Sequence, residues 1–254
     1  MNKRKPISRP LLFLLSLALL PFYLHAQDKS PEMLAEVWVM TPKADMQDAF
    51  EKGLKEHMAQ RVKLGDPRKW NVYRPVLGDG LNSYVIRACC FQWKDLDSYR
   101  NWSIEKDPMK HWNKNVDPKV HKYEHYLSVV DTQNSHWPED TKYNYVGVSW
   151  YQVKMGHWQE MEADKKLMSD LAKQHNWPYN WAWASSVSNG GSMSLAVPYA
   201  DYASMAPPAE SFAAFMGKHM GAEEKAKEML KRWASHFEER HYNIYRHDKE
   251  LSME

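Results

Sequence analysis

The chain has few of the features that usually reveal a protein's chemistry. Its 254 residues include only two cysteines, too few for a disulfide framework. No GxSxG, P-loop or GxGxxG motif occurs, so the sequence carries no signature of a nucleophile elbow or of a bound nucleotide. No HxH, HxxEH or Cys–His spacing on a regular element makes a convincing metal site, and we therefore expect no metal.

The two cysteines, Cys89 and Cys90, are adjacent. Successive residues of a β-strand point to opposite faces, so we expect two small hydrophobic side chains of a core strand. A vicinal redox pair or a metal site is the alternative, but no second thiol cluster supports it.

No apolar run is long enough for a membrane helix; the longest, residues 11–22, follows four basic residues and precedes Ala26. This pattern predicts a secretory signal peptide over residues 1–26, with an uncleaved anchor as the alternative. We therefore expect an exported protein, either periplasmic or extracellular.

The sequence also lacks an excess of positive charge once the leader is set aside. The leader carries four basic and no acidic side chains, so its removal changes the net charge from +2 to about −2. No run of Lys and Arg remains. We therefore expect no nucleic-acid partner and no stable membrane insertion of the mature chain.

What the sequence does contain is a weak internal repeat. Trp70 and Trp181 lie 111 positions apart, and the same offset places Gly78-Asp79-Gly80 on Asn189-Gly190-Gly191. Both triplets suit hairpin turns, because Gly and Asn accept positive φ. Near the end of each half, His125-Tyr126 matches His241-Tyr242. The common order of these matches predicts a duplicated unit.

Each unit is predicted to have the order β-α-β-β-α-β, which is the ferredoxin-like pattern. The first unit spans residues 27–138 and the second spans residues 139–254. We expect Asp45 to cap the first helix, the prolines between 107 and 118 to interrupt helical structure, and residues 131–140 to form a linker. A long helical stretch near 210–239 is predicted to divide at Gly217 or Gly221.

The predicted fold class is α+β, with two tandem ferredoxin-like units packed sheet to sheet as an intramolecular α/β barrel. The hairpin strands carry apolar or aromatic residues on both of their faces, as with Trp70 and Val72 on one face and Tyr73 on the other. Such strands require cover on both faces, and helices cover one face alone. We expect a monomeric pseudo-dimer or a higher homo-oligomer.

The order of elements, with the segments DPRKWNVYRPVLG, HNWPYNWAW and IYRHDKELSM, resembles the dimeric α/β-barrel superfamily. That superfamily includes antibiotic-biosynthesis monooxygenases, EthD-like proteins and NIPSNAP proteins, and the chain is similar to exported proteins with both units in one polypeptide. The resemblance implies a barrel formed by two sheets. The superfamily also contains haem enzymes, but the GxxDG element of the dye-decolourising peroxidases is absent.

Candidate binding residues come from two groups. Trp70, Trp181 and Trp183 lie on predicted central strands and could wall a pocket for a flat apolar ligand, although aromatic residues of this kind also fill cores. Charged or titratable side chains within apolar patterns form the second group, each of which could instead be a structural partner. They are Arg87, Arg74, His57, His125 and His241. We expect any pocket to lie between a sheet and its helices, with Arg87 and His57 as polar anchors.

Two functions remain open, and whether the protein is an enzyme is undecided. The first is an exported protein that binds a small apolar or aromatic ligand, or serves as an accessory protein, without a cofactor. The second is a cofactor-free monooxygenase or a haem-binding enzyme of the superfamily that the chain resembles.

Overall fold

The computed structural model describes residues 31–188 and 191–253, so the predicted signal peptide lies outside the described residues. In the first half the strands and helices run in the order β1 (Met33–Pro42), α1 (Gln47–Lys63), β2 (Trp70–Leu77), β3 (Tyr84–Phe91), α2 (Asp95–Lys106), α3 (Pro108–Asn115), η1 (Asp117–Lys119) and β4 (Val120–His136). In the second half they are β5 (Tyr145–Val153), α4 (Trp158–Gln174), β6 (Trp181–Ser186), β7 (Ser192–Tyr199), η2 (Ala203–Met205), α5 (Phe212–His219), α6 (Glu223–Ser235) and β8 (Phe237–Asp248).

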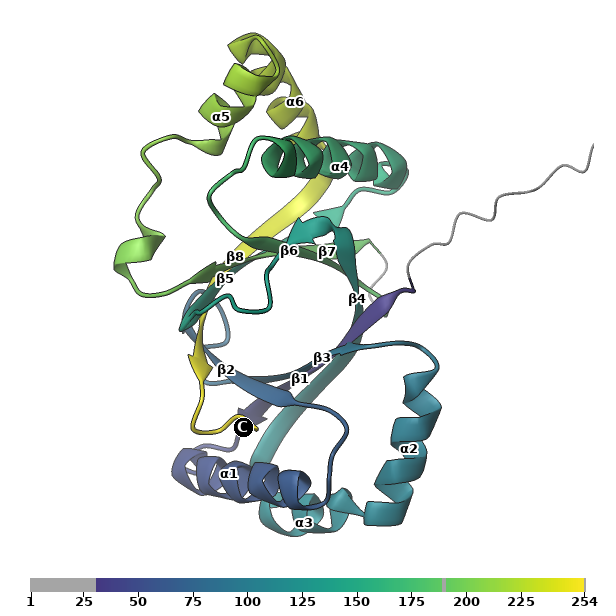
Figure 1. The fold of residues 1–254 in the computed structure, drawn as a ribbon. Coiled ribbons are helices and arrows are strands. Elements are labelled where there is room, and N and C mark those ends of the chain that lie inside the picture. The colour runs from purple at the N-terminus through teal and green to yellow at the C-terminus, as the bar shows by residue number, and fades with distance from the viewer. Residues whose placement is uncertain (1–30, 189–190, 254) are drawn as a thin grey trace, which may run out of the picture. The chain divides into compact units, whose positions relative to one another are not determined.

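All eight strands join in one closed barrel, in the order β1-β3-β2-β8-β5-β7-β6-β4. Every neighbouring pair is antiparallel. The order consists of β4-β1-β3-β2 from the first half followed by β8-β5-β7-β6 from the second. Figure 1 shows the ring of strands, with α1, α2 and α3 outside the first four and α4, α5 and α6 outside the others. The predicted α+β class and barrel are therefore confirmed.

The way the halves meet corrects one expectation. They do not pack sheet against sheet; they join edge to edge, by hydrogen-bonded ladders between β2 and β8 and between β4 and β6. Closure gives every strand two neighbours, which removes the free edges of both sheets. The inner faces consequently surround a space instead of forming a shared core.

Several local predictions also change. Residues 131–136 belong to β4 and not to a linker, because Asp131 pairs with Trp183 and His136 with Trp181 across the joint. Helical structure is interrupted at Asp107, as predicted, but Pro108 then begins a further helix, α3, since proline is tolerated at the first helical position. Asp45 has φ 61° in a turn and does not cap α1.

Other boundaries follow the pattern of the sequence. The division of the C-terminal helical stretch falls at Gly221, which has φ 75° and separates α5 from α6. Among the described residues, no helix is long and apolar enough to cross a membrane.

The hydrophobic cores lie between the sheets and the helices that cover them. The first-half core contains Phe50, Leu54, Trp70, Val72 and Ile86 among its buried members. Two clusters occupy the second half, and they are built from strand residues and from α4, α5 and α6. Trp70, Trp181 and Trp183 therefore face outward from the barrel, toward the helices.

The C-terminal segment ties the two halves together beyond the strand ladders. Leu251 and Met253 follow β8 of the second half but are buried in the first-half core. Met253 N donates to Trp70 O at 2.8 Å, and Val72 N donates to Ser252 Oγ at 2.8 Å. The first-half core thus includes residues from the far end of the chain.

Replacing Leu251 with Ala should lower the free energy of unfolding by about 2–4 kcal/mol, because it removes a side chain that is 5% exposed and leaves a cavity. Urea denaturation followed by circular dichroism measures the change. Leu81→Ala, at a position that is 62% exposed, is the matched control and should cost less than about 0.5 kcal/mol. Equal effects of the two substitutions would contradict the role assigned to the C-terminal segment.

Candidate functional site

The barrel encloses a cavity of about 1130 Å³, which we call the barrel cavity. Eight-stranded barrels are at the size where side chains either fill the interior or leave room for one small ligand. Here many inward-facing positions carry small side chains, and the interior stays open. These small residues are Ala35, Ser128, Ala182, Ala184, Ser194 and Ala196.

Arg87 is the charged residue that projects from β3 into this cavity. Among the described residues, none forms an ion pair or hydrogen bond with its guanidinium, although the side chain is half-buried. The other titratable residues with carboxylate or imidazole groups in the lining are exposed; they are Asp79, Glu124, His125, His136 and His241. Arg87 is therefore a cation whose natural partner would have to come from outside the described residues.

Aromatic side chains surround Arg87. Tyr73 and Tyr126 lie within its electrostatic reach, and the rings of Tyr126 and Trp150 meet edge to face at 6.2 Å. Burial raises the pKa of the Tyr73 and Tyr126 hydroxyls, although the charge of Arg87 acts in the opposite sense. Both tyrosines are consequently neutral at physiological pH, and neither neutralises the arginine.

Cys89 and Cys90 also line the barrel cavity, and their sulfurs are joined in a disulfide. The expectation of two separate hydrophobic side chains in a core strand is therefore wrong. The cause is an irregularity in the pairing of β1 with β3: Cys89 pairs with Ala35 and Phe91 with Leu34, which leaves Cys90 without a partner in the ladder. At such a bulge the alternation of faces is interrupted.

A second, smaller pocket of about 360 Å³ lies between the second-half strands and their helices; we call it the helix-side pocket. Trp181 and Trp183 are on its wall, together with Trp233 of α6 and Met168 of α4. The Trp181 indole donates to Asn134 O at 2.7 Å and the Trp183 indole to Ser169 Oγ at 3.3 Å. Among the described residues, no charged side chain is part of its lining, which makes this a pocket for apolar groups.

The structure does not bring Trp70 and His57 to the same cavity as Arg87. Trp70 pairs with Ala88 and Arg87 with Asn71, so Trp70 and Arg87 point to opposite faces of the sheet. Trp70 lies in the first-half core, where its indole donates to Asp66 Oδ2 at 3.2 Å. The anchor pair expected from the sequence, Arg87 with His57, is therefore divided by the sheet.

His57 is 1% exposed on α1 and lies against other aromatic and basic groups. Its Nε2 is 3.1 Å from Arg61 Nη1, and its ring is 5.5 Å from that of His111. Among the described residues, its Nδ1 has no hydrogen-bond partner. Burial, followed by the charge of Arg61 and by His111, lowers the pKa of His57 to about 3.

The remaining candidates already have partners within the protein. Arg74 forms an ion pair with Glu51 at 3.0 Å. His125 stacks on Trp38 at 3.9 Å between ring centroids. His241 is an exposed residue of the barrel cavity's lining, with its Nδ1 3.9 Å from Asp79 Oδ2.

Sequence reasoning missed Tyr73, Tyr126, Trp150 and Tyr245 as parts of the barrel cavity. The period-two alternation of each strand could have sorted them onto the face opposite the outward tryptophans. It could not have shown which strands become neighbours at the joints, and that pairing is what brings residues of the two halves around one space.

Comparison with solved structures gives the fold. A proposed monooxygenase from Lactobacillus acidophilus NCFM superposes with a TM-score of 0.56 at 8% identity, covering 86% of this chain and 95% of the other. A proposed monooxygenase from Fusobacterium nucleatum subsp. nucleatum ATCC 25586 gives 0.53 at 9% identity, covering 86% and 94%. No protein-family model and no curated protein sequence matches the chain.

The chain has the fold of the dimeric α/β-barrel superfamily. The resemblance expected from the sequence is thus confirmed at the level of fold. A haem-binding protein from Thermus thermophilus also matches, with a TM-score of 0.45 at 10% identity over 87% of this chain and 94% of the other.

Among the described residues, neither cavity has a buried histidine in its lining that could serve as an axial ligand to haem iron. Haem iron needs an axial His, Cys, Met or Tyr ligand, most often a histidine. The helix-side pocket has no histidine and no cation for the propionates in its lining. The histidines that line the barrel cavity are exposed, and His125 and His136 pack against tryptophan rings. No part of the proposed function is therefore assigned to haem.

Stability should depend on pH through His57. Its pKa is lowered to about 3 in the folded protein and is near 6.5 when unfolded, so below pH 6.5 the unfolded chain binds a proton that the folded chain does not. The folded state therefore loses stability as pH falls through that range. At pH 5 the loss from this residue alone should be about 2 kcal/mol relative to pH 7.

Urea unfolding of the wild type and of His57→Gln at pH 7 and pH 5 tests this. The variant should lose about 2 kcal/mol less than the wild type over the same interval, because the other titrating groups are common to both. If the two proteins lose equal stability, His57 is protonated in the fold and its assigned environment is wrong.

Proposed function

We propose that the protein is an exported small-molecule-binding protein, whose ligand lies in the barrel cavity with an anionic group on Arg87. The observation that carries the proposal is a half-buried guanidinium, without an ion pair among the described residues, inside a space of about 1130 Å³. The volume is slightly above the usual range of small-molecule sites, which is about 300–1,000 Å³.

The chemistry of the lining defines the ligand class. A guanidinium offers several N–H donors in a planar fork, which suits a carboxylate or a phenolate. Valine side chains and aromatic rings make up much of the rest of the cavity wall, including Val37, Val85 and Val148. The favoured ligand is therefore a flat, mainly apolar molecule with one negative charge.

The same proposal includes the finer description of the fold. Residues 27–138 and 139–254 are two tandem ferredoxin-like units, and their joined sheets act as a pseudo-dimer within one chain. The strand order β4-β1-β3-β2, repeated as β8-β5-β7-β6, supports this description.

An enzyme remains the second candidate. A substrate anion held on Arg87 in a largely apolar space would suit a cofactor-free monooxygenase, and monooxygenase activity is proposed for two proteins with this fold. Oxygen consumption after adding a phenolic aromatic compound would favour this candidate, whereas binding without oxygen consumption favours a carrier.

Arg87→Met tests the binding site directly. The anionic dye 8-anilinonaphthalene-1-sulfonate should bind the wild type and lose at least about tenfold in affinity in the variant, since a charge-assisted hydrogen bond contributes about 1.5–3 kcal/mol. N-phenyl-1-naphthylamine has the same aromatic body without the sulfonate, and its affinity should change little. Fluorescence titration measures both.

The matched control is Arg246→Met, which removes an exposed arginine of β8 outside the cavity lining and should leave both affinities unchanged. The melting temperature of Arg87→Met should stay close to that of the wild type, because no internal ion pair is lost. A large fall in melting temperature, or equal loss of both dyes, would show that Arg87 is structural and would overturn the site.

Export is part of the proposal and rests on the sequence of residues 1–26 alone. The basic head, the short apolar run and Ala26 predict cleavage after Ala26. The intact mass of the protein recovered from the periplasm or the medium should correspond to a chain beginning at Gln27. A protein at that location that retains residues 1–26 would contradict cleavage.

A further inference from the structure

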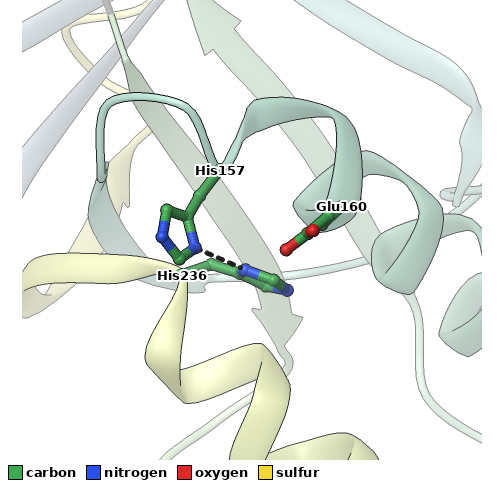
Figure 2. A group of neighbouring side chains, drawn as sticks. All are labelled: His157, Glu160 and His236. Carbon is green, nitrogen blue, oxygen red and sulfur yellow. Dashed lines mark hydrogen bonds between the residues drawn. The ribbon is translucent and has the colours of Figure 1, made fainter.

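A compact group of metal-binding side chains lies apart from both cavities, where the start of α4 meets the end of α6. It consists of His157, Glu160 and His236, whose candidate ligand atoms all lie within 4.8 Å of one another (Figure 2). His157 directly precedes α4, Glu160 is in its first turn, and His236 caps α6. The sequence did not reveal the group, because His236 comes from a different helix.

The distance between the two imidazoles fits a shared metal ion. His157 Nδ1 and His236 Nδ1 are 3.2 Å apart and face each other (Figure 2). In a tetrahedral zinc site with Zn–N bonds of about 2.0–2.1 Å, two nitrogen ligands lie about 3.3 Å apart. The pair therefore already has the spacing of one edge of such a site.

The second nitrogen of His236 supports the same assignment. His236 is 1% exposed, and its Nε2 lies 3.0 Å from Asp164 Oδ2. Metal-binding histidines commonly donate their other ring N–H to a carboxylate, which fixes the ring and leaves the lone pair on the metal side. Arg232 in turn holds Asp164, with Nε 2.9 Å from Oδ2, so the carboxylate is itself positioned.

The fold does not require these ligands, as a comparison of the two halves shows. Lys43 and Lys154 make equivalent contacts: Lys43 N donates to Lys119 O, and Lys154 N donates to His236 O, each at 2.8 Å. Lys119 is thus the counterpart of His236. Since α1 and α4 begin after Met46 and His157, those two residues also correspond.

The first half therefore reaches the same backbone arrangement with a methionine and a lysine where the second half has two histidines. Ala49, in the first turn of α1, takes the place of Glu160. Among the described residues, two imidazoles and a carboxylate converge in this way in the second half alone, which points to a ligand and not to a need of the fold.

We propose that His157, Glu160 and His236 bind one divalent zinc-type ion, with Asp164 orienting His236. Two imidazoles and one carboxylate form a three-ligand set, with water as the fourth ligand. Glu160 is exposed and His157 is half-buried, so the ion has access from solvent. The metal would link the beginning of α4 to the end of α6, and α6 supplies Trp233 to the helix-side pocket.

Isothermal titration of the chelator-treated full chain with zinc chloride tests the site. The wild type should bind one zinc per chain. His157→Gln should weaken binding by about 100-fold or more, and Glu160→Gln by about tenfold. Cobalt(II) as a second probe should give the visible absorption of a tetrahedral site in the wild type and lose it in His157→Gln.

His175→Gln is the matched control, because His175 follows the other end of α4 and stacks on His219 at 3.8 Å. It should bind zinc as the wild type does. Absence of stoichiometric binding would overturn the proposal and leave a simple N–H···N hydrogen bond between His157 and His236. Unchanged affinity in His157→Gln, or equal loss in His175→Gln, would overturn it as well.

Discussion

The closure of the barrel by two strand ladders is the constraint on which the rest of the structure depends. Each half alone would leave β2 and β4, or β6 and β8, with unpaired backbone groups along one edge. The β2–β8 and β4–β6 ladders satisfy both pairs of edges at once. This closure also explains why β4 is as long as 17 residues: its first part pairs with β1, and its last part reaches β6.

The cavity follows from how residue size is distributed over the two faces of the closed sheet. Outward positions carry Trp70, Trp181 and Trp183, which fill the space beneath the helices. Inward positions such as Ala182 and Ser194 carry side chains that are too small to meet across the barrel. The many tryptophans therefore account mainly for the helix-side cores, and the barrel interior keeps the room in which Arg87 lies.

The sequence predicted the strands and helices better than it predicted which strands pair with each other. Period-two strands, the hairpins and the break at Gly221 are encoded locally, and they appear where the pattern placed them. The pairing of residues 131–136 with β6 depends on a strand almost fifty residues away, so a local reading assigned them to a linker. The inward direction of Cys90 depends on a bulge, and no alternation rule reveals one.

The candidate sites show the same limit, together with a difference between the halves. Arg87 stood out in the sequence because a charge in an apolar strand must find a partner. That Arg87 and His57 lie on opposite sides of the sheet, however, depends on the register in which the strands pair. The first-half core receives Leu251 and Met253 from the C-terminal segment. Among the described residues, segment 137–144, which follows β4 as that segment follows β8, gives the second-half clusters no member. The added side chains fill one helix-side core, and in the other a pocket remains beneath α4, α5 and α6, although both halves share one pattern of strands.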